Sequence, residues 1–328
     1  MQTKIVYTLV SDNSDTYLEQ ALLSVYSLRL HNPQAIVELV VDQFTAMTIV
    51  DKREEIKKYI TNLIVIEVPS ELNKVQRSRY LKTNLRKFIE GDYLFIDCDT
   101  VICGKLDEID NFDGDIGMVA DINGKLPLND NAVIERCHKA GFSNLKEKPY
   151  YNSGVIFSRD TEISQELYAE WAKLWHLSNE KGVSFDQPAL CQANVNLDLP
   201  INELNGVWNC QFKYTNGYKF LKKAKILHYY SNNGAGKRAY AQDRIFEYIK
   251  EKGRIDKAVD NIIKHPDTIL YSVMTINDDK AFEYFNASPI YLYQNVPMGF
   301  LLLKVIANIF IKIHMSFSSL KHAISKRK

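Results

Sequence analysis

The sequence predicts an α/β protein with a mostly parallel β-sheet between layers of helices. Short apolar runs of strand length alternate along the chain with longer stretches of helical periodicity. Such alternation is typical of a sheet that is covered by helices on both faces. The chain has 328 residues, of which 46% are hydrophobic, and this is enough for one large α/β domain with an appendage.

The predicted elements follow one another in a regular order. Residues 5–10 form an apolar run that predicts the first strand, and residues 17–30 place apolar side chains mostly at helical spacing. Further strands are predicted at residues 36–41, 63–68, 93–96, 116–120, 154–157 and 226–230. Further helices are predicted at residues 51–60, 78–89 and 161–177. The helix at 78–89 is followed by Gly91, which suits a left-handed cap.

Composition and charge argue against several classes of protein. A formal net charge of +1 offers no wide basic field, so no nucleic-acid partner is expected. No Gly-x-Gly-x-x-Gly follows the first predicted strand, which argues against a dinucleotide-binding dehydrogenase. The five cysteines match no zinc or redox spacing, and we expect free thiols in a reducing compartment. The chain enters its first strand without a charged and apolar leader, so no signal peptide is expected.

The strand predicted at residues 93–96 runs directly into Asp97-Cys98-Asp99. Two carboxylates one residue apart, in a loop after a buried strand, can bind a hard divalent cation that also coordinates substrate phosphates. A second such pair, at residues 113–115, contains glycine and is interpreted as a turn. Residues 11–13, 97–99 and Asp121 all follow predicted strands, so we expect them at one edge of the sheet, where ligands of such sheets bind.

Five short motifs follow one another over most of residues 1–240. They are Ser78-Arg79-Tyr80-Leu81-Lys82 before Asp97-Cys98-Asp99, Asp121 after Met118-Val119-Ala120, Asn152-Ser153-Gly154-Val155, Phe185-Asp186-Gln187 at a helix start, and Ile226-Leu227-His228 with Gly234 and Lys237 downstream. The ordered set resembles glycosyltransferase family 8, the group that includes glycogenin and bacterial lipopolysaccharide galactosyltransferases and glucosyltransferases. The resemblance implies a GT-A type nucleotide-sugar-binding domain, here residues 1–255, and a retaining, metal-dependent glycosyltransferase.

The resemblance also implies roles for individual residues. Asp97, Asp99 and His228 would bind Mn²⁺ or Mg²⁺, and this ligand set suits Mn²⁺ and leaves positions open for phosphate oxygens. The nucleotide would contact residues after the first strand, on the basic helix and near the metal: Thr8, Val10, Ser11, Asn13, Tyr17, Arg79, Lys82, Cys98 and Lys237. The donor hexose would contact Asp121, Asn152, Ser153, Asp186 and Gln187.

Catalysis is expected at Asp186 and Gln187. In retaining hydrolases one carboxylate acts as nucleophile. Family 8 sites resemble a case without a well-placed nucleophile, in which Gln187 lies closest to the sugar and the leaving phosphate acts as base; Asp186 is the alternative nucleophile. Ser11 stands where relatives often have an acidic residue, which leaves the nucleotide preference open. Arg238-Ala239 replaces the usual Pro-Trp after Lys237, which leaves the role of that lysine open.

Residues 256–328 differ in character from the rest of the chain. They are first aromatic-rich and then strongly apolar between residues 298 and 317. Polar residues recur there at every fourth position: Lys304, Asn308, Lys312 and Ser316. This pattern predicts a helix that lies in a membrane interface with its lysines at anionic headgroups, helped by Lys326-Arg327-Lys328. A helix docked on the catalytic domain is the alternative.

The combined expectation is a hexosyltransferase at the cytoplasmic face of a bacterial membrane. It would move galactose or glucose from a UDP-sugar to a lipid-linked saccharide of lipopolysaccharide, capsule or O-chain. One alternative is a haloacid-dehalogenase-type phosphohydrolase, for which Asp97, Asp99 and Val101 would fit. Another is a non-catalytic sugar-nucleotide or glycan-binding module. The donor sugar, the acceptor hydroxyl and the oligomeric state stay open.

Overall fold

The computed structural model describes residues 1–124, 131–142, 145, 147–212, 215–229 and 241–264, and in the C-terminal part residues 298–299, 301–303, 305–310 and 312. The chain forms two compact units, Met1–Pro266 and Asp267–Lys328. The boundary that we predict between residues 255 and 256 stays a prediction.

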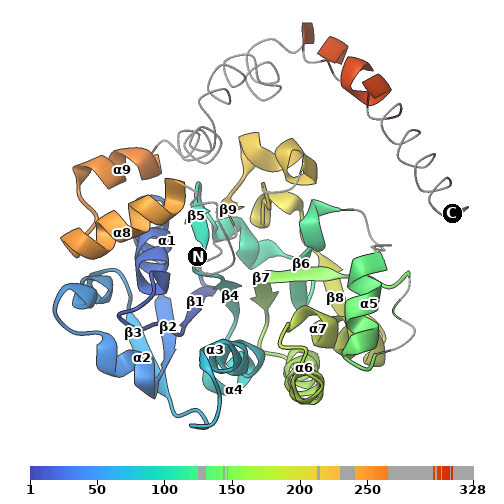
Figure 1. Cartoon of the computed structure of the whole chain (residues 1–328), viewed down its shortest axis with the longest axis horizontal. Helices are drawn as coiled ribbons and strands as arrows, with labels where there is room; N and C mark the ends of the chain where they lie inside the picture. The colour runs from blue at the N-terminus through green and yellow to red at the C-terminus, as the bar shows by residue number, and fades with distance from the viewer. Residues whose placement is uncertain are drawn as a thin grey trace, which may run out of the picture. The chain divides into compact units, whose positions relative to one another are not determined.

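A seven-stranded sheet forms the centre of the N-terminal unit, with the order β3-β2-β1-β4-β7-β6-β8 (Figure 1). Its strands are β1 (Lys4–Leu9), β2 (Val37–Asp42), β3 (Asn62–Ile66), β4 (Tyr93–Ile96), β6 (Ile116–Ala120), β7 (Tyr151–Ser158) and β8 (Ile201–Glu203). Strand β1 is parallel to its neighbours β2 and β4, and β2 is parallel to β3. The β6–β8 pair is also parallel. Only β7 runs against both of its neighbours, so the α/β architecture with a mostly parallel sheet is confirmed.

The α-helices of this unit are α1 (Tyr17–His31), α2 (Gln43–Thr48), α3 (Lys74–Thr83), α4 (Leu85–Phe88), α5 (Asn131–Lys139), α6 (Glu162–Glu180), α7 (Gln187–Asn196), α8 (Ala241–Lys252) and α9 (Lys257–Lys264). Local sequence explains where several of them begin. Asn73 and Gln76 form a capping box at the start of α3. Pro188 stands in the first turn of α7, where its missing N–H is not needed.

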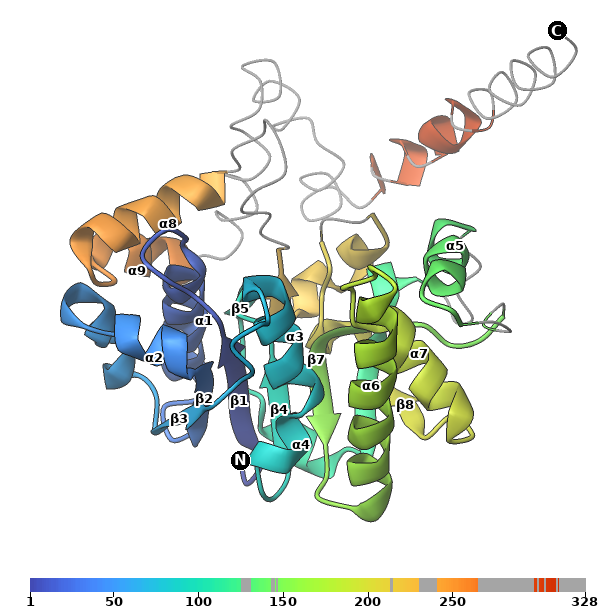
Figure 2. The same ribbon diagram turned by 60° about the horizontal axis from the view of Figure 1, so that its bottom comes forward.

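Helices cover both faces of the sheet. Figure 2 shows α3, α4 and α6 in front of the central strands. Alternate residues of β1 explain the two layers, because successive side chains of a strand point to opposite faces. Val6 belongs to a buried cluster with Leu81 of α3 and Leu85 of α4. The hydroxyl of Tyr7 points the other way and lies 3.1 Å from the hydroxyl of Ser24 on α1.

A second, two-stranded sheet carries His228, one of the predicted site residues. It pairs β5 (Thr100–Ile102) with β9 (Ile226–His228) in antiparallel fashion. The sequence predicts a strand at 226–230, but the strand ends at His228 and lies outside the main sheet. The short strands β5 and β8 were not predicted at all, because three residues are too few for an alternating pattern to emerge.

Two of the predicted helices are wrong in detail. The helix predicted at 78–89 is two helices, α3 and α4, with Asn84 between them. Asn84 binds the carbonyl of Tyr80 through its own side chain, which competes with continuation of the helix. The segment predicted as a helix at 51–60 is the 3₁₀ helix η1 (Asp51–Lys58).

The described residues of the C-terminal unit are helical and bear exposed apolar side chains. Met298 is 79% exposed, and Leu302 and Phe310 are each 66% exposed. Within the described part of the chain, no helix is both long and apolar enough to cross a membrane. Association of this segment with a membrane surface stays a prediction.

Candidate active site

The topology brings the predicted site residues to one edge of the main sheet. Strands β1, β4 and β6 run in the same direction, so residues 10–13, 97–99 and Asp121 follow their carboxyl ends at that edge. Because β7 runs in the opposite direction, its first residues, Asn152 and Ser153, lie at this edge as well. The strand order therefore explains why three of the five sequence motifs meet the loop after β1 at one edge.

Asp97, Asp99 and His228 come together as the sequence predicts. One possible ligand atom from each of the three side chains lies within 4.8 Å of the others. The imidazole Nε2 of His228 is 3.2 Å from Oδ1 of Asp99. The β5–β9 pairing causes this approach, because Thr100 stands opposite His228 in the register and Asp99 immediately precedes Thr100.

The loop that carries the two aspartates is fixed by its main chain. The N–H of Asp97 donates to the carbonyl of Gly154 at 2.7 Å, and the N–H of Tyr229 donates to the carbonyl of Asp99 at 3.1 Å. The Thr100 hydroxyl donates to the Asp97 carbonyl at 2.9 Å. These bonds tie the loop to β7 and to the end of β9, so the carboxylates are positioned before any ligand arrives.

The cluster fits a divalent cation. It combines two partly exposed carboxylates with an imidazole that is 97% buried, a donor set that Mn²⁺ accepts. Lys82 of α3 lies at one side of it, with its ammonium 3.0 Å and 3.1 Å from the two oxygens of Asp97. A bound cation would therefore share Asp97 with this buried ammonium.

Asp186 lies beside the same lysine and is almost fully buried. Its Oδ1 is 3.2 Å from Nε of Arg79, and its Oδ2 accepts a 2.8 Å hydrogen bond from the Ser153 hydroxyl. The Lys82 ammonium is 3.8 Å from the same Oδ2. Burial alone would raise the pKa of Asp186, but Arg79, Lys82 and Ser153 together hold the pKa below its usual value. Asp186 is therefore an ionised carboxylate engaged with two cations.

Asp121, Asn152 and Gln187 form a polar wall of the site near Asp186. The Asn152 amide donates to Oδ1 of Asp121 at 2.9 Å, and the Gln187 amide donates to the carbonyl of Tyr151 at 3.2 Å. Burial raises the pKa of Asp121, although hydrogen bonds from Asn152 and Gln187 oppose the shift. This wall offers a carboxylate and two amides, which suits the hydroxyls of a sugar.

The loop after β1 holds the predicted nucleotide-binding residues in a network of charges. The guanidinium of Arg53 donates to the Ser11 hydroxyl at 3.0 Å and to the Asp12 carbonyl at 3.2 Å. Lys74 bridges Asp12 and Asp15, at 2.6 Å and 2.8 Å. The Ser11 hydroxyl donates in turn to Asp15 at 2.7 Å. Ser11 is thus engaged with two charged side chains of the protein.

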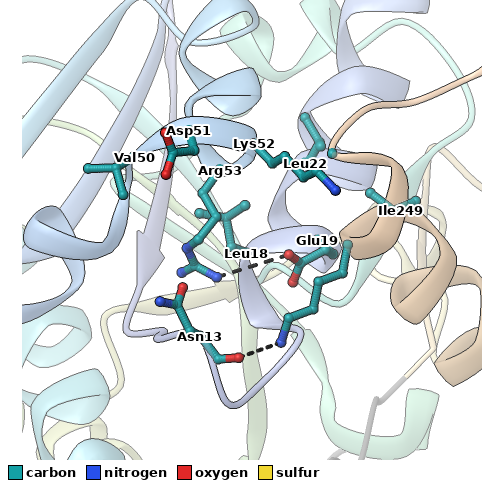
Figure 3. A pocket seen from close by; sticks show the side chains of 11 residues that line it. Asn13, Leu18, Glu19, Leu22, Val50, Asp51, Lys52, Arg53 and Ile249 are labelled. Carbon is teal, nitrogen blue, oxygen red and sulfur yellow. Dashed lines mark hydrogen bonds and ion pairs between the residues drawn. The ribbon is translucent and has the colours of Figure 1, made fainter.

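A pocket of about 390 Å³ lies behind this loop, between α1, η1 and α8. Figure 3 shows the Arg53 guanidinium and the Glu19 carboxylate facing each other across it, 4.0 Å apart. Lys250 of α8 donates to the carbonyls of Asn13 and Asp15, each at 2.7 Å. The metal ligands do not line this pocket.

The other predicted nucleotide contacts lie near the same edge. Val10 is buried, whereas Thr8 and Tyr17 are partly exposed. Burial raises the pKa of the Tyr17 phenol, and Asp15 and Asp99 add to the rise, which places the phenol within the field of the metal cluster. The Cys98 thiol donates to the carbonyl of Thr8 at 3.3 Å. Lys237 and Gly234 lie outside the described residues.

Three features of the site escaped the sequence analysis. Asn209 is fully buried and lies 3.0 Å from Nδ1 of His228. Arg53 and Lys250 support the loop after β1 from distant parts of the chain. No motif of the predicted family set contains these residues, and each acts through a contact between segments that only the fold brings together.

Comparison with models of protein families identifies the family of the chain. Residues 8–237 match the family model described as Glycosyl transferase family 8. The chain therefore belongs to glycosyltransferase family 8. Membership of this family excludes the alternative that the chain is a haloacid-dehalogenase-type phosphohydrolase. A comparison with curated proteins gives no significant match.

The solved structures that resemble the chain are remote. The glycosyltransferase GlyE of Streptococcus pneumoniae is 18% identical, with a TM-score of 0.48 over 80% of this chain. The galactosyltransferase LgtC, solved with donor and acceptor sugar analogues, is 13% identical, with a TM-score of 0.48 over 79% of this chain and 99% of its own. Mouse xyloside xylosyltransferase 1 is 13% identical, with a TM-score of 0.48 over 72% of this chain and all of its own. The chain spans 63% of the length of GlyE.

Proposed function

We propose that this glycosyltransferase is a retaining, metal-dependent enzyme that moves a hexose, galactose or glucose, from a UDP-sugar to a saccharide acceptor. The observation that carries the proposal is the meeting of Asp97, Asp99 and His228 at the edge of the sheet. Two carboxylates and an imidazole in reach of one another are suited to a divalent cation that also binds a diphosphate.

The surrounding side chains supply the remaining functions in this proposal. Asp97, Asp99 and His228 would hold Mn²⁺ or Mg²⁺, whose chemistry is to neutralise the diphosphate as the glycosidic bond breaks. Arg79 and Lys82 face the same space and add positive charge beside the departing phosphate. The loop at residues 11–17 would bind the nucleoside, and Lys237 stays a predicted phosphate contact.

The donor hexose would lie between the Asp186 side and the Asp121 wall. Asp121 and Asn152 would orient its hydroxyls, and Ser153 would hold Asp186 in place. Both oxygens of Asp186 already face cations or a hydroxyl, which makes the carboxylate a poor nucleophile without rearrangement. This favours attack on the same face as departure, beside Gln187, with the leaving phosphate as base.

Kinetics of two matched variants test this assignment. Asp186→Asn keeps the size of the side chain and removes its charge, whereas Gln187→Glu adds a carboxylate at the neighbouring position. Front-face attack predicts that Asp186→Asn retains turnover, lowered by about 10- to 100-fold through the loss of ion pairs. Accumulation of a covalent glycosyl-enzyme on Asp186 would establish Asp186 as the nucleophile. Complete loss of turnover in Asp186→Asn with normal UDP binding would contradict the front-face prediction.

A screen of sugar nucleotides tests the function itself. We expect hydrolysis of UDP-galactose or UDP-glucose when Mn²⁺ is present, and little when the cation is chelated. UDP binding without turnover of any donor, with any acceptor, would instead indicate the binding module. A matched variant pair separates the site from the fold: Asp99→Asn removes a proposed ligand, and Asp113→Asn alters the turn that also contains an Asp-x-Asp sequence.

We further propose a lipid-linked acceptor at the cytoplasmic face of a bacterial membrane. The supporting observation is the series of exposed apolar side chains on the helical part of residues 298–312. Deletion after Pro297 is expected to abolish sedimentation with anionic vesicles while donor hydrolysis persists. Replacing Lys326, Arg327 and Lys328 by alanine tests the contribution of charge, and unchanged sedimentation of the deletion variant would reject the membrane role.

A further inference from the structure

A chain of hydrogen bonds joins the proposed metal ligand to the proposed sugar-binding wall. It starts at His228, whose Nδ1 lies 3.0 Å from Oδ1 of Asn209. The Asn209 amide nitrogen donates to Oδ1 of Asn152 at 2.8 Å, and the Asn152 amide nitrogen donates to Oδ1 of Asp121 at 2.9 Å. Asn209 and Asn152 are 0% and 4% exposed.

A backbone group fixes the direction of every bond in this chain. The N–H of Gly154 donates to Oδ1 of Asn152 at 2.9 Å. Because a backbone N–H can only donate, the Asn152 atom that faces it must be the oxygen. The Asn209 atom that donates to the same oxygen must then be its nitrogen. The remaining Asn209 atom, the oxygen, therefore faces the imidazole.

This direction determines where His228 carries a proton. An amide oxygen can only accept, so Nδ1 of His228 must be the N–H donor. The lone pair of the neutral ring is then on Nε2, the nitrogen that lies 3.2 Å from Asp99. A metal-binding imidazole needs this arrangement, with its other nitrogen held by an acceptor.

Close packing holds the imidazole in the same place. A Cβ on Gly154 would lie 2.8 Å from Nδ1 of His228 and 2.9 Å from Oδ1 of Asn152, and it would also collide with Cε1 of the ring. Glycine is thus the residue that lets the ring and the amide approach the strand. The same residue supplies both the space for the ring and the N–H that orients the amides.

We propose that Asn209 is a positioning residue for the metal centre, which fixes His228 with the lone pair of Nε2 beside Asp99 and links the ring to Asn152. The inference rests on the proposed function, because it takes His228 as a metal ligand. It adds a role for a residue on the segment before η5 (Thr215–Lys223), outside the five motifs of the sequence analysis.

The test uses electron paramagnetic resonance in the presence of equimolar UDP. It measures the affinity for Mn²⁺, and it measures the modulation of the Mn²⁺ spin echo by the nitrogen of a coordinated imidazole. Asn209→Leu removes the acceptor at similar volume and is expected to weaken Mn²⁺ binding by about 10- to 100-fold and to reduce the nitrogen signal. Asn209→Asp keeps an acceptor opposite Nδ1 but puts an oxygen in place of the nitrogen that donates to Asn152, so it is expected to restore the nitrogen signal and only part of the Mn²⁺ affinity.

Asn194→Leu is the matched control. Asn194 is also 0% exposed, and its side-chain oxygen accepts a hydrogen bond from the N–H of Ile201 at 3.1 Å, away from the metal cluster. Comparable thermal destabilisation with unchanged Mn²⁺ affinity is expected for it.

The outcomes separate this inference from the proposed function. Wild-type affinity and nitrogen modulation in Asn209→Leu would overturn the positioning role and leave His228 as a ligand. An Asn209→Asp variant whose nitrogen signal is as low as that of Asn209→Leu would overturn the acceptor role of Asn209. Bound Mn²⁺ without nitrogen modulation in the wild-type protein would overturn both the ligand role of His228 and the inference.

Discussion

The metal cluster and the loop after β1 belong to the same edge of the sheet, but different forces hold them. Neutral amides, which are almost fully buried, surround His228 and give each hydrogen bond one direction. Three cations from three separate elements hold the loop, through Arg53, Lys74 and Lys250. Part of that network is exposed, since the Asp12 side chain is 41% and the Lys74 side chain 32% accessible.

This contrast indicates how each region responds to substitution. A buried amide chain has no substitute partner, so removing one member leaves its neighbours unsatisfied. Exposed ion pairs contribute little individually and are weakened by salt. We therefore expect large, salt-independent effects at the metal cluster and small, salt-dependent effects at the loop.

The largest effect is expected for Asp99→Asn. The variant loses a charged ligand and the partner that lies 3.2 Å from His228. Turnover of the donor should fall by more than about 100-fold, because even outer partners of metal ligands contribute about 10- to 100-fold. Steady-state rates against Mn²⁺ concentration measure this, and activity of Asp99→Asn at the level of Asp113→Asn would contradict the metal site.

A smaller but distinct effect is expected for Gly154→Ala. The added methyl group must displace either His228 or the Asn152 amide, which are both within 3 Å of its position. The Mn²⁺ concentration for half-maximal activity should rise by about 10-fold, as for other disturbed outer-shell contacts. Gly104→Ala is the control, since a Cβ there meets nothing within 4 Å. Equal Mn²⁺ dependence of the two variants would remove the steric argument.

The two regions also differ in how well the sequence predicts them. The sequence predicts the paired aspartates and the strand before them because a buried apolar run ends there in charged residues. It also predicts the alternation of strands and helices around them. Strand direction was not predictable from the same pattern, and the antiparallel β7 is what brings Asn152 to the site.

Contacts between remote segments explain what was missed. Asn209 looks like any polar residue between short elements. The parallel bridge between Cys210 and Leu227 is what places His228 beside it. Arg53 and Lys250 belong to segments that read as ordinary charged helices, yet both donate to the loop after β1. A charged residue on a helix is usually solvated, so its sequence alone carries no sign of such a contact.

At the loop, Lys250→Met should have a modest effect. The variant loses the bonds to the carbonyls of Asn13 and Asp15, but Arg53 and Lys74 stay in place. We expect the KM for the donor to rise by about 2- to 5-fold at low salt, with little change in kcat. Lys257→Met, on an exposed residue at the start of α9, is the control. A change in activity as large as that expected for Gly154→Ala would show that Arg53 and Lys74 alone do not hold the loop in place.

The smallest effect concerns the free energy of unfolding. It has opposite signs for Asp12, in the loop after β1, and for Asp121, which the buried amides join to His228. The hydrogen bond from Lys74, helped by Ser14, lowers the pKa of Asp12, whereas burial raises the pKa of Asp121. Ionised Asp12 therefore stabilises the fold above the pKa of the unfolded chain, about 3.9, and this contribution is lost as the pH falls through the lower folded value. Asp121 behaves in the reverse sense, because the unfolded chain ionises first as the pH rises.

At pH 7, Asp12→Asn should then lower the melting temperature, and Asp121→Asn should raise it by about 1–3 °C. Both differences should shrink as the pH is lowered towards 4, which thermal unfolding followed by circular dichroism can measure. An increase in stability together with lost donor turnover in Asp121→Asn would mark Asp121 as an acid kept for function at the expense of stability. A decrease in stability at pH 7 would mean that its hydrogen bonds to Asn152 and Gln187 outweigh its burial.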